Sequence, residues 1–498
     1  GPKRALAREL SAERFELIDR KTGLSVFGKS IENVSTRIGR YSVMDFTEFR
    51  EPGLYIIKAG QLRTRPFRID DDVWRDTAIK TINFFYCERC GDRIEGIHDI
   101  CHRDWRVRSD EGEIVINGGW HDAGDLSQGL VNTSEAVYAM FDFAEHRAMN
   151  DPALAERLIE EARWGLDWIL KCRFGQGERC VWATMDFWTD GIMGTMDDVV
   201  AQAKNEPFAN LLAASAEAIA GRLLHDQDPI RASYALNAAK EDWRFAMEKC
   251  ENPNLQLAAT AVQASMDLYM ATGDKSYADK AISLSTILTR SQRKKIPDWD
   301  IPILGFFYTG TNRDRILHYF HRSHEQAPVV ALVTLCEAFP NHPDWMDWYS
   351  TVVLYSEYMK QVARYTEPYS MLPASIYDLN ESDGDGFRQQ VLNGIQLDET
   401  HYLRLFPVWE AFRGNYGVML SQASALSAAA HLRNDLDLIH LCENQLQWVV
   451  GKNPFVQSTM YGEGYNYAPQ YTAMSGNMVG SLPVGIQTRF DRDAPYWP

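Results

Sequence analysis

Two carboxylates, three positions apart on a turn of small residues, are the feature of the chain that most directly suggests chemistry. Residues 117–125 read Asn-Gly-Gly-Trp-His-Asp-Ala-Gly-Asp, so Asp122 and Asp125 are separated by Ala-Gly. Small residues let the backbone turn tightly and let another molecule approach closely, so both acids can face one open site. The pair predicts proton transfer or cation binding, calcium included. Ordinary solvated turns share this composition.

Four thiol and imidazole side chains near this loop form a second candidate site. Thiolate and imidazole are the preferred ligands of zinc, and two of each complete a closed tetrahedral structural site. The spacing differs from that of a zinc finger, and Cys87 and His98 are rival ligands. Unrelated buried residues therefore remain the alternative. The four candidates are Cys90, Cys101, His102 and His121.

Composition excludes several classes of partner. The chain has 498 residues, 45% of them apolar, and a formal net charge of −17. Nucleic acids and anionic membranes bind clustered Lys and Arg, so neither is expected as a partner, whereas an uncharged polysaccharide meets no electrostatic penalty. No apolar run of about 18 residues predicts a membrane span. The eight cysteines are too scattered for a disulfide framework, although Cys172 and Cys180 are near enough in sequence to form a bridge.

The first 70 residues are predicted to form a small β-sandwich module. Short β-prone runs alternate there with turn signals such as Lys21-Thr22-Gly23 and Glu51-Pro52-Gly53. We expect this module to pack against the rest of the chain. The predicted strands are 15–18, 26–27, 41–46, 54–58 and 65–69.

From residue 71 to residue 498 the apolar pattern has the period of helices. Asp-Pro and Gly-Asp pairs recur between apolar helical segments, where they supply a stop and the next N-cap. Alanine-rich faces at 211–220 and 423–430 permit close helix packing, as two concentric helical layers require. We count about eleven helices.

Several strings along the chain resemble glycoside hydrolase family 9, the endoglucanase family, and particularly its members with an N-terminal immunoglobulin-like module. They are Phe-Phe-Tyr-Cys-Glu-Arg-Cys-Gly at 84–91, His-Asp-Ile-Cys-His at 98–102, Gly-Gly-Trp-His-Asp-Ala-Gly-Asp at 118–125, Val-Gly-Lys-Asn-Pro at 450–454 and Tyr-Gly-Glu-Gly at 461–464. The Asp-Ala-Gly-Asp loop is the most specific of them.

The resemblance implies a fold and a reaction. The fold is a mostly α (α/α)6 barrel of twelve helices over residues 71–498, after an immunoglobulin-like β-sandwich over 1–70. The reaction is hydrolysis of a β-glycan with inversion, with Asp125 as general base and Asp122 holding the attacking water. The resemblance also places structural zinc on the four cysteines and histidines, where His121 would secure the loop that bears Asp122.

The family's proton donor is a Glu just before the last barrel helix, and no Glu follows Glu463 here. Either the chain continues beyond Pro498, or it is a diverged member without that acid. In the first case, further C-terminal residues would complete the barrel. A partner chain is the other expected cover for the seam between the first and last helices. Without such a cover, residues 1–498 alone would be poorly stable and inactive.

Aromatic and polar residues in loop-like stretches are candidates for binding sugar, since a flat ring can lie against a pyranose. The resemblance implies a secreted or periplasmic protein, although no signal peptide is recognised in the sequence. A catalytically weak or inactive carbohydrate-binding relative is the alternative function. The candidate sugar-binding residues are Trp188, His324, Arg413 and Tyr465.

Overall fold

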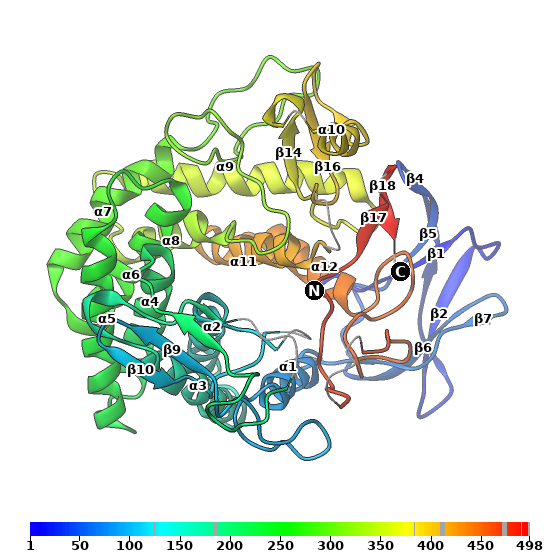
Figure 1. Ribbon diagram of the computed structural model, residues 1–498. Helices are drawn as coiled ribbons and strands as arrows, with labels where there is room; N and C mark the ends of the chain where they lie inside the picture. The colour runs from blue at the N-terminus through cyan, green and yellow to red at the C-terminus, as the bar shows by residue number, and fades with distance from the viewer. Residues whose placement is uncertain are drawn as a thin grey trace.

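The structure is a computed structural model, in which a β-rich N-terminal part lies beside a much larger helical part (Figure 1). This mostly α-helical architecture, with antiparallel sheets at the N-terminus, confirms the predicted fold class. The structure describes residues 1–122, 126–183, 188–382, 384–408, 414–470, 476–489 and 491–496.

The N-terminal part contains two antiparallel sheets, one of strand order β1-β5-β4 and one of β3-β2-β6-β7 with β8 also paired to β6. Side chains alternate between buried and partly exposed along β2 and β6, as expected for a sheet with one covered face. Sequence analysis missed β1, which has arginine at both ends, and β4, whose residues are mostly polar or charged. The strands are β1 Arg4–Arg8, β2 Arg14–Asp19, β3 Ser25–Ser30, β4 Glu32–Thr36, β5 Gly39–Asp45, β6 Gly53–Ala59, β7 Leu62–Arg63 and β8 Phe67–Ile69.

Twelve α-helices occur in the described residues, one more than the eleven counted from the sequence. The additional one is the eight-residue α10, which lies among short strands in a connection. The helices are α1 Arg75–Cys87, α2 Leu130–Arg147, α3 Pro152–Lys171, α4 Pro207–Leu223, α5 Pro229–Glu248, α6 Leu255–Thr272, α7 Lys275–Arg290, α8 Gln326–Ala338, α9 Trp345–Ala363, α10 Asp385–Leu392, α11 Tyr416–Arg433 and α12 Leu436–Val449.

Predicted stop-and-cap signals define several helix ends. The side chains of Asp151, Asp228, Asp274 and Asp435 each accept a backbone N–H in the first turn of the helix that follows. Such caps satisfy N–H groups that have no partner within the helix.

Short strands lie in the segments that connect the helices and in the segment after α12. They are β9 Arg106–Ser109, β10 Gly112–Val115, β11 Gln128–Gly129, β12 Trp182–Ala183, β13 Val200–Gln202, β14 Ser375–Asp378, β15 Ile395–Gln396, β16 His401–Arg404, β17 Gln487–Arg489 and β18 Arg492–Tyr496.

The helices form two layers. The inner helices α2, α4, α6, α8 and α11 contact one another in that order, and each packs with the following helix, α3, α5, α7, α9 or α12, of the outer layer. Both alanine-rich faces predicted from the sequence lie on inner helices, α4 and α11, where small side chains allow close approach. None of the described helices is long and apolar enough to cross a membrane.

A segment that follows α12 lies against α1, at the seam between the first and last helices (Figure 1). Lys80 of α1 forms an ion pair with Glu463 at 2.8 Å, and Asn83 donates to the carbonyl of Val479 at 2.8 Å. We expected the cover for this seam to come from residues beyond Pro498 or from a partner chain. Part of the cover instead comes from residues within the sequence itself.

We predict that Asn254→Ala lowers the free energy of unfolding by about 1 kcal/mol. The Asn254 side chain caps α6, because its Oδ1 accepts the backbone N–H of Leu257 at 2.9 Å. Differential scanning calorimetry should show a lower Tm than that of the wild type. Asn237→Ala, at an exposed position inside α5, is the matched control and should leave Tm unchanged or slightly raised. Equal effects of the two substitutions would contradict the capping role.

Candidate active site and metal centre

The loop that leads to Asp122 is held tightly against α3. Gly118 and Gly119 have φ angles of 103° and 64°, in the left-handed region that glycine tolerates best. A Cβ at Gly119 would lie 2.8 Å from Cγ of Trp168. The indole N–H of Trp164 donates to the carbonyl of Gly119 at 2.6 Å. Two tryptophans of α3 thus fix the backbone just before the predicted catalytic residues.

Asp122 has two polar partners on its two carboxylate oxygens. The side-chain amide of Asn132, in the first turn of α2, donates to Oδ1. The guanidinium of Arg322 lies 3.5 Å from Oδ2. The backbone N–H of Asp122 donates to the carbonyl of Ser127 at 2.7 Å, and 23% of its side chain remains exposed. Asp122 is therefore an oriented carboxylate that solvent or a ligand can reach. Asp125, the predicted base, lies outside the described residues.

Arg322 is itself held by an aromatic ring. Its guanidinium carbon lies 4.4 Å from the ring centroid of Trp182, a distance typical of a cation–π contact. Sequence analysis singled out neither Trp182 nor Asn132. No local signal could have found them, because they lie about 60 and 10 positions from Asp122 in the sequence and only the fold brings them together.

The four predicted metal ligands lie together, all of them buried. One ligand atom from each of Cys90, Cys101, His102 and His121 lies within 4.8 Å of the others. Cys90 Sγ is 3.4 Å from His102 Nδ1, Cys101 Sγ is 3.6 Å from His121 Nε2, and the two imidazole nitrogens are 3.2 Å apart. Ligands around tetrahedral zinc are separated by about 3.3–3.8 Å, as bond lengths of about 2.0–2.3 Å require. The donor set and its spacing therefore fit a zinc ion.

The electrostatics of this cluster suit a cation. The hydrogen bond with Cys90 lowers the pKa of the Cys101 thiol below its ordinary value; burial opposes this, and contacts with His102 and His121 add to the lowering. Glu88 lies 3.5 Å from Nδ1 of His121, which leaves Nε2 of that ring facing the cluster. A carboxylate behind a histidine is a common way to orient a metal ligand.

Neither rival ligand belongs to this group of four, although the His98 side chain also contacts the thiol of Cys101. Nε2 of His98 is 3.1 Å from the carbonyl of Cys87, and Nδ1 is 2.8 Å from the carbonyl of Asp99, so both ring nitrogens have backbone partners.

Cys172 and Cys180, which the sequence suggested as a possible disulfide, are both free and buried.

The predicted sugar-binding residues have different surroundings, and their role stays a prediction. The half-buried Trp188 stacks on His98 at 5.2 Å and on His102 at 5.7 Å, next to the metal cluster. His324 is 7% exposed and pairs with Glu135 at 2.9 Å. Tyr465 is 61% exposed and lies under the guanidinium of Arg65 at 5.2 Å. Arg413 lies outside the described residues.

A group of carboxylates relevant to the calcium prediction lies near the loop 189–198. Oxygens of Asp104, Asp197 and Asp198 lie within 4.8 Å of one another. Asp104 already accepts hydrogen bonds from Thr189 at 2.5 Å and from the backbone N–H of Gly191 at 3.2 Å. Hydrogen bonds within the protein thus account for the position of Asp104.

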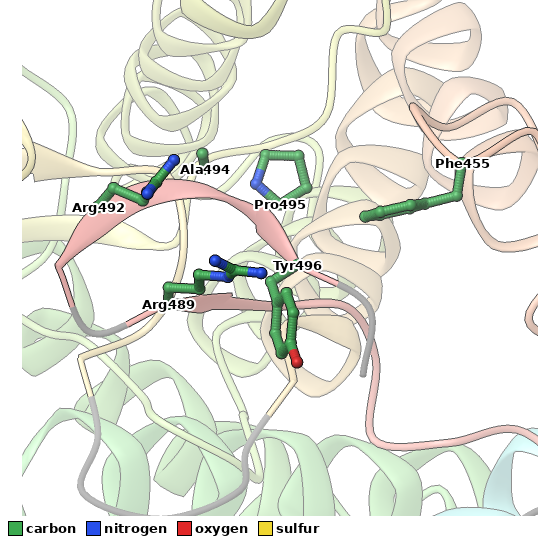
Figure 2. A pocket seen from close by; sticks show the side chains of 6 residues that line it. All are labelled: Phe455, Arg489, Arg492, Ala494, Pro495 and Tyr496. Carbon is green, nitrogen blue, oxygen red and sulfur yellow. The ribbon is translucent and has the colours of Figure 1, made fainter.

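A surface hollow of about 430 Å³ lies beside the β17–β18 hairpin, away from these residues (Figure 2). Its lining includes Arg489, Tyr496 and, from the other side, Phe455. The guanidinium of Arg489 lies 4.7 Å from the ring centroid of Tyr496, so the two side chains pack against each other. None of the residues that line the hollow was predicted to bind substrate.

Comparison with known proteins points to one family. The sequence profile described as "Glycosyl hydrolase family 9" matches residues 74–476. Endoglucanase C of Cellulomonas fimi is 26% identical over 317 residues, which are 50% of this chain and 28% of that protein. A xyloglucan-specific endo-beta-1,4-glucanase of Bacteroides ovatus is 25% identical over 187 residues, 32% of each chain. The chain spans about a third of the length of the curated relatives it matches.

Solved structures share the fold. A mutant of a thermostable endoglucanase from Alicyclobacillus acidocaldarius superposes with a TM-score of 0.69 at 19% identity, covering 98% of this chain and 88% of that one. A Zn-binding triple mutant of the family 9 endoglucanase J30 gives a TM-score of 0.68 at 20% identity, covering 97% and 89%.

We predict that Gly119→Ala destabilises the protein by about 3 kcal/mol, because it adds both backbone strain at positive φ and a clash with Trp168. Gly96→Ala is the matched control, since Gly96 has a φ of 79° but a Cβ added there would meet no atom within 4 Å. It should cost only about 1 kcal/mol. Urea unfolding followed by tryptophan fluorescence measures both variants, and equal losses would show that packing on α3 is unimportant.

Proposed function

Because the chain belongs to glycosyl hydrolase family 9, we propose that it hydrolyses the β-glycosidic bonds of a polysaccharide or oligosaccharide. The observation that carries this proposal is the oriented and partly exposed carboxylate of Asp122, within the segment that the family profile matches. The curated relatives are named for action on glucans, and a β-glucan is accordingly the proposed substrate class. We also propose that the protein acts outside the cytoplasm, in the periplasm or as a secreted protein.

We propose an inverting reaction with Asp125 as general base and Asp122 as its helper. In such a reaction the base removes a proton from a water that attacks the anomeric carbon, while an acid about 6.5–9.5 Å away protonates the leaving oxygen. Two carboxylates three residues apart suit one shared water better than opposite sides of a glycosidic bond. Asn132 and Arg322 support the role of Asp122, because they turn its oxygens to fixed directions.

Glu463 is unsuited to the role of proton donor. Its carboxylate pairs with Lys80 at 2.8 Å and accepts the hydroxyl of Thr77 at 3.2 Å. These contacts direct the Glu463 carboxylate at α1, so it is not free to approach a leaving oxygen. Glu463 therefore has the role of attaching the C-terminal segment to α1, and we assign the donor to none of the described residues.

We propose a structural zinc ion on Cys90, Cys101, His102 and His121. The four bonds to such an ion would stabilise this part of the fold, as hydrophobic packing does elsewhere. The backbone of His121 continues directly into Asp122, and its N–H donates to the carbonyl of Glu88 at 2.8 Å. Through this connection the metal ligands hold the position of the catalytic loop while taking no part in the reaction.

We predict that Asp125→Ala abolishes hydrolysis and that Asp122→Ala leaves about 1% of it, because removal of a base costs more than removal of its helper. Release of reducing ends from soluble β-glucans measures activity, and the anomer formed, observed by NMR, tests inversion. Asp110→Ala, at an exposed position on a nearby turn, should match the wild type. If the wild type binds β-glucans in a pull-down but cleaves none, the chain is a carbohydrate-binding relative and not a hydrolase.

We predict about one zinc ion per chain by plasma mass spectrometry of the purified protein. Cys101→Ser should lose the metal, because a hydroxyl is a poor replacement for a thiolate. Cys180→Ser, which removes another fully buried thiol, should keep it. A chelator should lower the Tm of the wild type and leave that of Cys101→Ser unchanged. A metal-free wild type with a chelator-independent Tm would refute the site.

A further inference from the structure

We propose that Arg322 is a positioning residue that fixes the rotation of the Asp122 carboxylate. This inference deepens the proposed function and rests on it. It assigns to Arg322 a task within the protein itself.

The Asp122 carboxylate is held from two sides. Rotation about the terminal bond of an aspartate side chain is soft, so a single hydrogen bond leaves the two oxygens poorly defined. Here Asn132 donates to Oδ1 and Arg322 approaches Oδ2 at 3.5 Å. Two donors on different oxygens select one orientation of the group. Without Arg322 the carboxylate would keep only one of these two constraints.

Arg322 is in turn placed by Trp182 of β12, which packs against the residue before α2. Its guanidinium lies over the ring of Trp182, 4.4 Å from the centroid. Trp182 pairs with Gly129 in the β11–β12 ladder, and a Cβ at Gly129 would lie 2.3 Å from the Trp182 ring. Gly129 directly precedes α2, the helix that carries Asn132. The N-terminal end of α2 therefore positions both partners of Asp122. It carries Asn132, and Gly129 just before it packs against Trp182, the ring that lies under Arg322.

A second polar contact fixes the segment that carries Arg322. Nδ1 of His324, two residues further on, lies 2.9 Å from the carboxylate of Glu135, one turn beyond Asn132 on α2. The His324 ring also meets the ring of Phe208 edge-on at 4.8 Å. Glu325, the next residue, is buried and accepts the hydroxyl of Tyr355 at 3.1 Å. These contacts hold the main chain two and three residues after Arg322.

These contacts predict an effect on turnover and not on substrate affinity. Arg322 keeps 43% of its side chain exposed, and an ion pair of that exposure contributes little to stability. A misoriented Asp122 would leave the attacking water badly placed in the transition state. Loss of an interaction that acts only there lowers kcat and kcat/KM together and leaves KM unchanged.

The test compares Arg322→Met, Arg322→Lys and the wild type on a soluble β-glucan. We expect kcat of Arg322→Met to fall about 10- to 100-fold with KM within about twofold, because small errors of placement carry costs of this size. Arg322→Lys should recover part of the loss, and added methylguanidinium should partly rescue Arg322→Met. Arg157→Met is the matched control, since Arg157 pairs with Glu160 on α3 at similar exposure, and its kcat should match the wild type.

Crystal structures of the wild type and Arg322→Met provide a readout that needs no activity. The Asp122 carboxylate should adopt one orientation in the wild type and a different orientation, or two orientations, in the variant. An unchanged orientation, or an unchanged kcat in an active protein, would overturn the inference. A rise in KM at constant kcat would overturn it too, because it would place Arg322 on the substrate. If the wild type cleaves no glycan, the proposed function fails, and the crystal comparison still decides the role of Arg322.

Discussion

The close approach of the segment 116–122 to α3 is the constraint on which the rest of the site depends. Trp168 donates to the carbonyl of Ile116 at 2.7 Å, Trp164 donates to that of Gly119 at 2.6 Å, and Trp120 donates to the buried carboxylate of Glu161 at 2.9 Å. All three contacts end on α3. Because glycine at 119 leaves room for the Trp168 ring, the segment can lie directly on the helix. It then places His121, a candidate metal ligand, next to the carboxylate of Asp122.

Buried charge elsewhere in the barrel gives this support its rigidity. The fully buried guanidinium of Arg179 pairs with Glu217 of α4 and Asp242 of α5, and it donates to the carbonyl of Ile169 at the end of α3. Burial raises the pKa of Glu217 well above its ordinary value, and the nearby Asp242 raises it further. Separation of Arg179 from its carboxylate partners would leave an uncompensated charge in the interior, so α3, α4 and α5 keep one arrangement.

The fold could be predicted where local chemistry decides structure. Aspartates before Pro152 and Pro229 predicted two helix starts, since capping and the fixed φ of proline act within a few residues. The strands β1 and β4 were not predicted, because their pairing with β5 supplies the hydrogen bonds that hold them and their own short sequences do not indicate it. The short helix α10 escaped for a similar reason: at eight residues it shows too little periodicity to recognise.

The sequence by itself determined which chemical groups the protein has and in what order: carboxylates on a small-residue turn, two thiols and two imidazoles nearby, and a long series of capped helices. The tertiary structure decided which of these groups meet. It brought Cys90 and His121 into one buried cluster, and it placed Arg322 on a carboxylate 200 positions earlier. Contacts of that range depend on how helices pack, and packing follows from side chains spread over the whole chain and not from any local pattern.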